Sequence, residues 1–138
     1  MAPAGLNGGS YPNSAAVEFN TSLYTQHVLT IIVPNDLLWI APEANAVVVR
    51  WTAPATGTYW IFGQFQGLDL DLPSVTVAVY EDQATELFSN SLTFFGDYQD
   101  FNLSGLTLRK GSTIDFVATS TDAANDNVGL TATIDQNN

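Results

Sequence analysis

Short runs of alternating apolar and polar residues, broken by turn residues, constrain this chain more than any other feature. The clearest run spans residues 128–134 and has an apolar side chain at every second position: Val128, Leu130, Ala132 and Ile134. This period of two gives a β-strand one buried face and one solvated face, and no stretch keeps the 3.6-residue period of a helix. We therefore predict an all-β fold, an antiparallel, jelly-roll-like β-sandwich of about 8–10 strands.

Turn-forming Gly, Pro, Asn and Asp residues separate the expected strands. These strands are residues 29–33, 37–41, 46–52, 58–66, 74–80, 85–90, 92–95, 100–103, 113–120 and 128–134. The glycines and prolines of residues 1–22 predict an irregular N-terminal arm. Residues 23–138 then have the length expected of a single β-sandwich domain.

Charged side chains are few and strongly unbalanced. Lys and Arg together number 3 against 14 Asp and Glu, so the net charge is −11. A chain this acidic has no cluster of cations for a phosphate backbone, which excludes a nucleic-acid-binding function. The chain has no run of ~18 apolar residues, so we also expect no membrane span.

Catalytic side chains are scarce as well. The chain has no cysteine, and His27 is its single histidine, whereas serine triads and zinc sites need more partners than this. Two carboxylate pairs, Asp69 with Asp71 and Glu81 with Glu86, have the chemistry for glycoside hydrolysis, but acids in turns are commonly just solvated. We expect no enzyme activity and no required cofactor.

Two acidic loops offer oxygen ligands for calcium, which takes several carboxylate, amide and carbonyl oxygens. One loop contributes Asp122, Asn125 and Asp126, and the other contributes Asp69 and Asp71. The alternative is that Asp and Asn occur here because their side chains stabilise turns. The sequence leaves both interpretations open, so calcium is a candidate ion.

Two expected strands, residues 46–52 and 59–65, are apolar on both faces. The outer face of a two-sheet sandwich is normally solvated. We therefore expect the surplus face, which carries Trp60 and Phe62, to be covered by the arm, a loop, another subunit or a ligand.

Aromatic side chains with amides nearby suggest a sugar-binding platform. Trp60, Trp39 and Tyr98 are the candidate rings, and Gln64 is a candidate amide partner. A planar ring suits the apolar face of a pyranose, and amides suit its hydroxyl groups. Trp and Tyr in strands also serve as core or interface residues, which is the alternative interpretation.

Several stretches resemble a known family. They are residues 38–42, 47–59, 63–69, 111–117 and 129–134. In these stretches the chain resembles a domain of exported bacterial proteins, including those with PEP-CTERM sorting tails. The resemblance implies an extracellular β-sandwich similar to carbohydrate-binding modules. The Thr-Ala-Pro-x-x-Gly-x-Tyr element at residues 52–59 is similar, at a weaker level, to C1q and TNF jelly rolls, which assemble as trimers.

Two functions follow from these observations. The first is a non-catalytic extracellular module that binds a glycan or another cell-surface component. The second is a self-assembling structural protein of a virion or surface filament, a homo-oligomer in which the N-terminal arm contacts a neighbouring copy. Both place the protein outside the cell or on a surface, although residues 1–5 lack the basic and apolar regions of a signal peptide.

Overall fold

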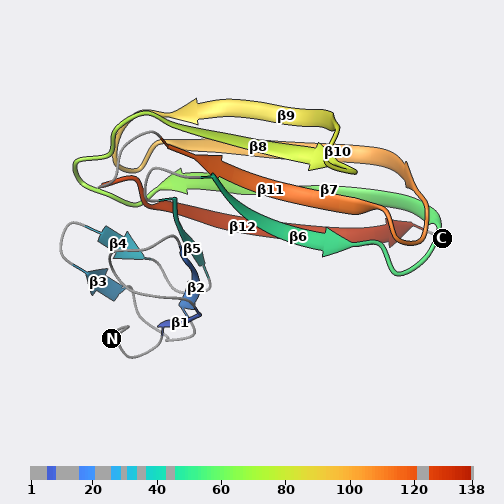
Figure 1. The fold of residues 1–138 in the computed structure, drawn as a ribbon, viewed down its shortest axis with the longest axis horizontal. Helices are drawn as coiled ribbons and strands as arrows, with labels where there is room; N and C mark the ends of the chain where they lie inside the picture. Colours follow the sequence, from blue (N-terminus) through green and yellow to red (C-terminus); the bar gives the residue numbers. More distant parts are fainter. Residues whose placement is uncertain are drawn as a thin grey trace.

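The protein is a sandwich of two antiparallel β-sheets (Figure 1). The computed structural model describes residues 6–8, 16–20, 26–28, 31–33, 37–42, 46–120 and 125–137, and it describes side chains for residues 37–42, 46–120 and 125–136. Its strands are β1 (Leu6–Gly8), β2 (Ala16–Asn20), β3 (Gln26–Val28), β4 (Ile31–Val33), β5 (Leu38–Ala41), β6 (Ala46–Thr52), β7 (Gly57–Gly67), β8 (Val75–Glu81), β9 (Thr85–Leu92), β10 (Tyr98–Leu108), β11 (Thr113–Thr119) and β12 (Val128–Asn137). No helix among the described residues is long and apolar enough to cross a membrane.

The order of strands in the two sheets differs from their order in the chain. One sheet is β1-β2-β5-β12-β7-β10 and the other is β6-β11-β8-β9, while β3 and β4 form a separate pair. The C-terminal strand β12 therefore lies between β5 and β7, and it pairs with both. This arrangement confirms the predicted antiparallel β-sandwich.

The observed strands match most of the expected segments. Residues 46–52 form β6 as predicted. The expected strand at 92–95 is wrong, because β9 ends at Leu92 and residues 93–97 form the connection to β10. The backbone of the expected arm also differs from the prediction. Within residues 1–22, β2 pairs with β5 and β1 pairs with β2, so these parts of the arm extend the larger sheet.

Aromatic rings join the two sheets in the interior. Phe101 on β10 lies 5.5 Å from Phe65 and 5.7 Å from Phe116 on the opposite sheet, measured between ring centroids. Phe88 on β9 completes the group, at 5.8 Å from Phe101. Apolar residues from both sheets surround these rings, among them Ile61, Val75, Val77, Val79, Ile114, Val128 and Leu130. Burial of this surface stabilises the sandwich.

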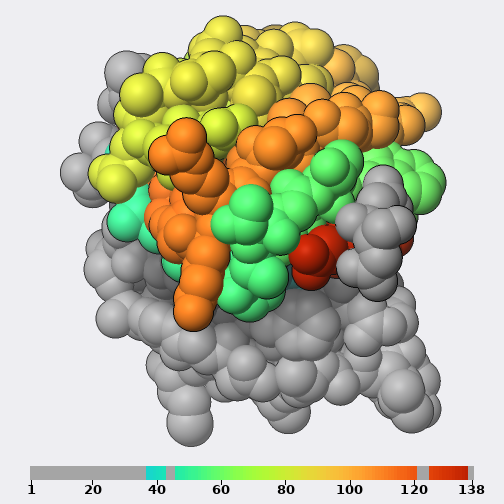
Figure 2. Space-filling view, turned by 90° about the vertical axis from the view of Figure 1, so that its right-hand side faces the viewer, coloured from blue at the N-terminus to red at the C-terminus, as the bar shows by residue number. Residues whose placement is uncertain are grey.

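Two turns pack together at one end of the molecule, where Figure 2 shows the segments near residues 55 and 110 side by side. The backbone N–H of Ala53 donates to the carbonyl of Ser112, and that of Gly111 donates to the carbonyl of Ala53. The hydroxyl of Tyr59 donates to the carbonyl of Ala55 at 2.6 Å. The first two bonds join the turn before β7 to the turn between β10 and β11, and the third joins it to the start of β7.

The outer faces of the two doubly apolar strands are not buried by the described residues. Trp60 on β7 is 37% exposed and Val48 on β6 is 46% exposed. The prediction that these faces are covered is therefore not met by the described part of this chain. Phe62 is half-buried beside Trp60, with 4.4 Å between the ring centroids.

Gly63→Ala should destabilise the fold, because an added methyl group would meet the carbonyl oxygen of Thr131 and would lie 2.8 Å from Cζ of Phe101. Overpacking of a closed core costs about 1–3 kcal/mol. Urea denaturation should show this loss in the free energy of unfolding. Gly57→Ala is the matched control, since its methyl group would chiefly meet the mobile end of the Gln136 side chain. Equal losses in the two variants would contradict this account.

Candidate functional site

Three neighbouring strands, β12, β7 and β10, build a continuous outer face on the larger sheet. Because Tyr59, Ile61 and Phe65 point into the core, the alternate residues of β7 point outward. The strand register places these residues in rows with polar partners: Thr131, Gln64 and Asp100, then Thr133, Phe62 and Asn102. Trp60 lies in the next row, opposite Asp135.

Hydrogen bonds across the β7–β10 pair hold the side chains of this face in place. The indole Nε1 of Trp60 donates to Oδ1 of Asn102 at 2.6 Å, and Nε2 of Gln64 donates to Oδ1 of Asp100 at 2.9 Å. Two polar groups, Nδ2 of Asn102 and Oδ2 of Asp100, take no part in these bonds. The face therefore combines positioned rings with hydrogen-bonding groups.

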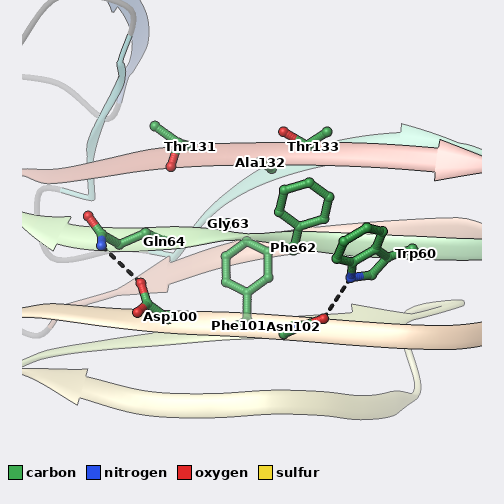
Figure 3. A pocket seen from close by; sticks show the side chains of 10 residues that line it. All are labelled: Trp60, Phe62, Gly63, Gln64, Asp100, Phe101, Asn102, Thr131, Ala132 and Thr133. Atoms are coloured by element: carbon green, nitrogen blue, oxygen red, sulfur yellow. Dashed lines mark hydrogen bonds between the residues drawn. The ribbon is translucent and has the colours of Figure 1, made fainter.

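The face is hollowed by about 440 Å³. Figure 3 shows the lining residues, which are Trp60, Phe62, Gly63, Gln64, Asp100, Phe101, Asn102, Thr131, Ala132 and Thr133. This volume is within the range of small-ligand sites. Asp100 is the one acidic residue in this lining, whereas glycoside hydrolysis uses two carboxylates.

The sequence singled out part of this lining. Trp60, Phe62 and Gln64 come together on one strand, and Tyr98 lies on the same face, 58% exposed, opposite Gln66. The reasoning missed Asp100, Thr131 and Thr133. Alternation along β10 and β12 is the signal that could have placed them on an outer face, but nothing local says that these strands flank β7.

Trp39 is a different case from Trp60. It is 3% exposed, and its indole Nε1 donates to Oδ1 of Asn127 at 2.6 Å. The prediction that Trp39 belongs to a sugar platform does not agree with this burial, so we leave it out of the site. Its ring is packed inside the molecule, which was the alternative interpretation.

The two acidic loops meet through Asn127. Its Nδ2 donates to Oδ2 of Asp69 at 2.8 Å, and both side chains are buried. Asp126 is buried as well, whereas Asp71 and Asn125 are exposed. Asp122 lies outside the described residues.

Within the described part of the chain, three or more Asp, Glu or His side chains do not gather as they would around a metal ion. The hydrogen bond between Asn127 and Asp69 links the two loops. Calcium binding by these loops stays a prediction.

The outer face of the smaller sheet has a different character. Arg50 forms two hydrogen bonds to the buried carboxylate of Asp115, at 2.7 and 2.8 Å. The hydrogen bond raises the pKa of Arg50 above its ordinary value, and partial burial opposes this effect. Tyr80 lies in the same row, next to Glu86. Burial raises the pKa of Tyr80 above its ordinary value, and the Glu86 carboxylate raises it further. The outer face of the smaller sheet thus carries the Arg50–Asp115 ion pair, whereas that of the larger sheet carries the Trp60–Phe62 ring pair.

Comparisons with known proteins show the fold. No family model matches the sequence, and no curated protein matches it. The chain is similar to a CBM61 module in complex with β-1,4-galactotriose, with a TM-score of 0.50 and 11% identity over 97% of this chain and 90% of that chain.

Two further structures are similar at lower scores. One is a CBM36 carbohydrate-binding module in complex with calcium and xylotriose, with a TM-score of 0.45 and 13% identity over 94% of this chain and 92% of that one. The other is an arabinose-bound α-L-arabinofuranosidase, with a TM-score of 0.48 and 12% identity over 95% of this chain and 23% of that one.

Asn127→Asp should destabilise the protein at neutral pH by about 1–3 kcal/mol, because it removes a buried donor and sets a second carboxylate against Asp69. Repulsion and burial raise the folded-state pKa of the introduced carboxyl above its unfolded value of ~3.9. The difference from the parent protein should thus be small below that value and should grow as pH rises through the raised pKa. Denaturation at several pH values measures it.

Asn90→Asp is the matched control for this variant, because it introduces the same charge at an exposed position. It should change stability little at any of these pH values. A loss in the Asn127 variant that did not depend on pH would contradict the buried contact between Asn127 and Asp69.

Proposed function

We propose that the protein is a non-catalytic, glycan-binding β-sandwich module whose site is the outer face of β7, β10 and β12. The observation that carries this proposal is the pairing of Trp60 with Phe62 beside Gln64, Asp100 and Asn102. Rings and hydrogen-bonding groups are combined within one hollow, and that combination matches the chemistry of a sugar.

A pyranose ring has an apolar face of C–H groups and a rim of hydroxyl groups. The exposed part of Trp60 can pack against the first, since aromatic rings supply large apolar contact area at fixed geometry. Asp100, Asn102 and the threonines of β12 can exchange hydrogen bonds with the second. The two cross-strand bonds preposition Trp60 and Gln64, which reduces the entropy lost on binding.

The similarity to the CBM61 module supports this proposal at the level of fold, since that module binds β-1,4-galactotriose. The resemblance of the sequence to exported bacterial domains supports an extracellular place of action. We also propose calcium as an ion to test, bound by oxygens of the loops that contain Asp71 and Asn125.

Trp60→Ala should weaken glycan binding by roughly 30-fold, because truncation of a central aromatic residue commonly costs about 2 kcal/mol. Affinity electrophoresis through gels that contain soluble polysaccharides, followed by calorimetry on those that retard the protein, would measure it. Tyr80→Ala is the matched control, since Tyr80 lies on the outer face of the other sheet. Unchanged retardation of the Trp60 variant would overturn this site.

Self-assembly is the second candidate function, favoured by the exposure of Trp60 and Val48 on opposite sheets. Light scattering of the parent protein and the Trp60→Ala variant tests it. An oligomer that dissociates in the variant, together with no retardation by any polysaccharide, would assign the face to a second copy of the chain. A monomer in both would leave glycan binding as the function of this face.

A further inference from the structure

We infer that the ligand is an uncharged glycan chain that lies along β7. This inference rests on the proposed function and specifies the class of glycan. Three features of the described residues carry it: the charge around the hollow, the length of the face, and the position of a second aromatic side chain.

The charge around the hollow is negative. Asp100 lines it, and Asp135 lies opposite Trp60 in the adjacent row. None of the chain's three cations is among the residues that line the hollow. Arg50 lies on the other sheet and is paired with Asp115.

Arg109 and Lys110 follow the end of β10 at Leu108, whose partner Gly57 lies three residues, or roughly 10 Å, along β7 from Trp60 and seven residues from Gln64. Charges at that distance are largely screened, since the Debye length is about 8 Å at physiological ionic strength. A uronate, sulfate or phosphate group would therefore meet acidic side chains with no compensating cation. Hydroxyl groups of a neutral sugar, in contrast, can donate to Asp100.

The face is longer than a single sugar. From Trp60 to Gln66 the strand spans six residues, or roughly 20 Å. Gln66 pairs with Tyr98, which is 58% exposed on the same face. Gly129 completes this row on β12, and the space that a side chain there would fill is taken by Leu37.

The two ends of this face therefore carry aromatic side chains, and the part between them carries polar ones. Trp60 and Phe62 lie at one end and Tyr98 at the other. Between them, Oδ2 of Asp100 and Nδ2 of Asn102 are not used in the cross-strand hydrogen bonds. Such a sequence of ring, polar groups and ring suits several consecutive sugars, because each ring can hold a different unit of the chain.

A length series tests the chain-like ligand. Calorimetry with neutral β-1,4-linked galacto-, xylo- and gluco-oligosaccharides, from monosaccharide to hexasaccharide, should show affinity rising with length in at least one series. Trp60→Ala should weaken binding at every length. Tyr98→Ala should not change the affinity for the shortest oligosaccharide that binds. It should lower the affinity for the longest by about tenfold, which corresponds to a loss of about 1.4 kcal/mol.

Tyr80→Ala is the control for both aromatic variants, and circular dichroism would verify that each variant is folded. Affinity that is already maximal for the monosaccharide, or a Tyr98→Ala effect equal at all lengths, would overturn the chain-like ligand. It would leave the proposed sugar site in place. Absence of binding by all neutral and acidic glycans would instead overturn the proposed function itself.

A charge test addresses the exclusion of acidic glycans. Oligogalacturonides should bind at least tenfold more weakly than the best neutral series at physiological ionic strength. Asp100→Asn keeps the oxygen that accepts from Gln64 and removes the negative charge, so it should reduce the difference in affinity between neutral chains and oligogalacturonides. Glu86→Gln removes a negative charge on the other sheet and should leave this difference in affinity unchanged. Tighter binding of oligogalacturonides than of neutral chains by the parent protein would overturn the inference.

Discussion

Phe101 lies against Gly63 in the interior of the sandwich, and much of the rest of the molecule depends on this contact. The missing side chain at residue 63 gives the ring room between β7 and the opposite sheet, where it meets Phe116. Because side chains alternate along a strand, fixing residue 63 toward the core also fixes residues 62 and 64 toward solvent. The functional face is therefore a direct consequence of how the core is packed.

Cross-strand hydrogen bonds then convert that face from a set of exposed side chains into an ordered surface. Trp60 is a large apolar residue in water, and by itself it would have several rotamers. Its bond to Asn102 limits them, and the bond between Gln64 and Asp100 does the same one row away. Both bonds join β7 to β10, so the order of the site depends on the register of this strand pair.

The two sheets divide the polar chemistry of the molecule between them. Asp115 is buried on the outer face of the smaller sheet, where the bidentate contact with Arg50 compensates its charge. On the larger sheet, Asp100 accepts a hydrogen bond from the neutral Gln64, and no Arg or Lys is among the described residues that line the hollow. The smaller sheet thus carries an ion pair on its outer face, whereas the larger sheet carries aromatic rings and Asp100 around a hollow.

The sequence by itself determined the fold class, most strand positions and the orientation of Trp60, Phe62 and Gln64 on a common face. These features depend on local alternation and turn residues, which can be read one segment at a time. Only the tertiary structure decided that β12 lies beside β7, and hence that Asp100, Thr131 and Thr133 join the site. It also decided that Trp39 is buried and that Asn127 links the two acidic loops. The reason is that strand order and loop contacts are set by packing between segments far apart in the chain, and a local pattern carries no record of its partner.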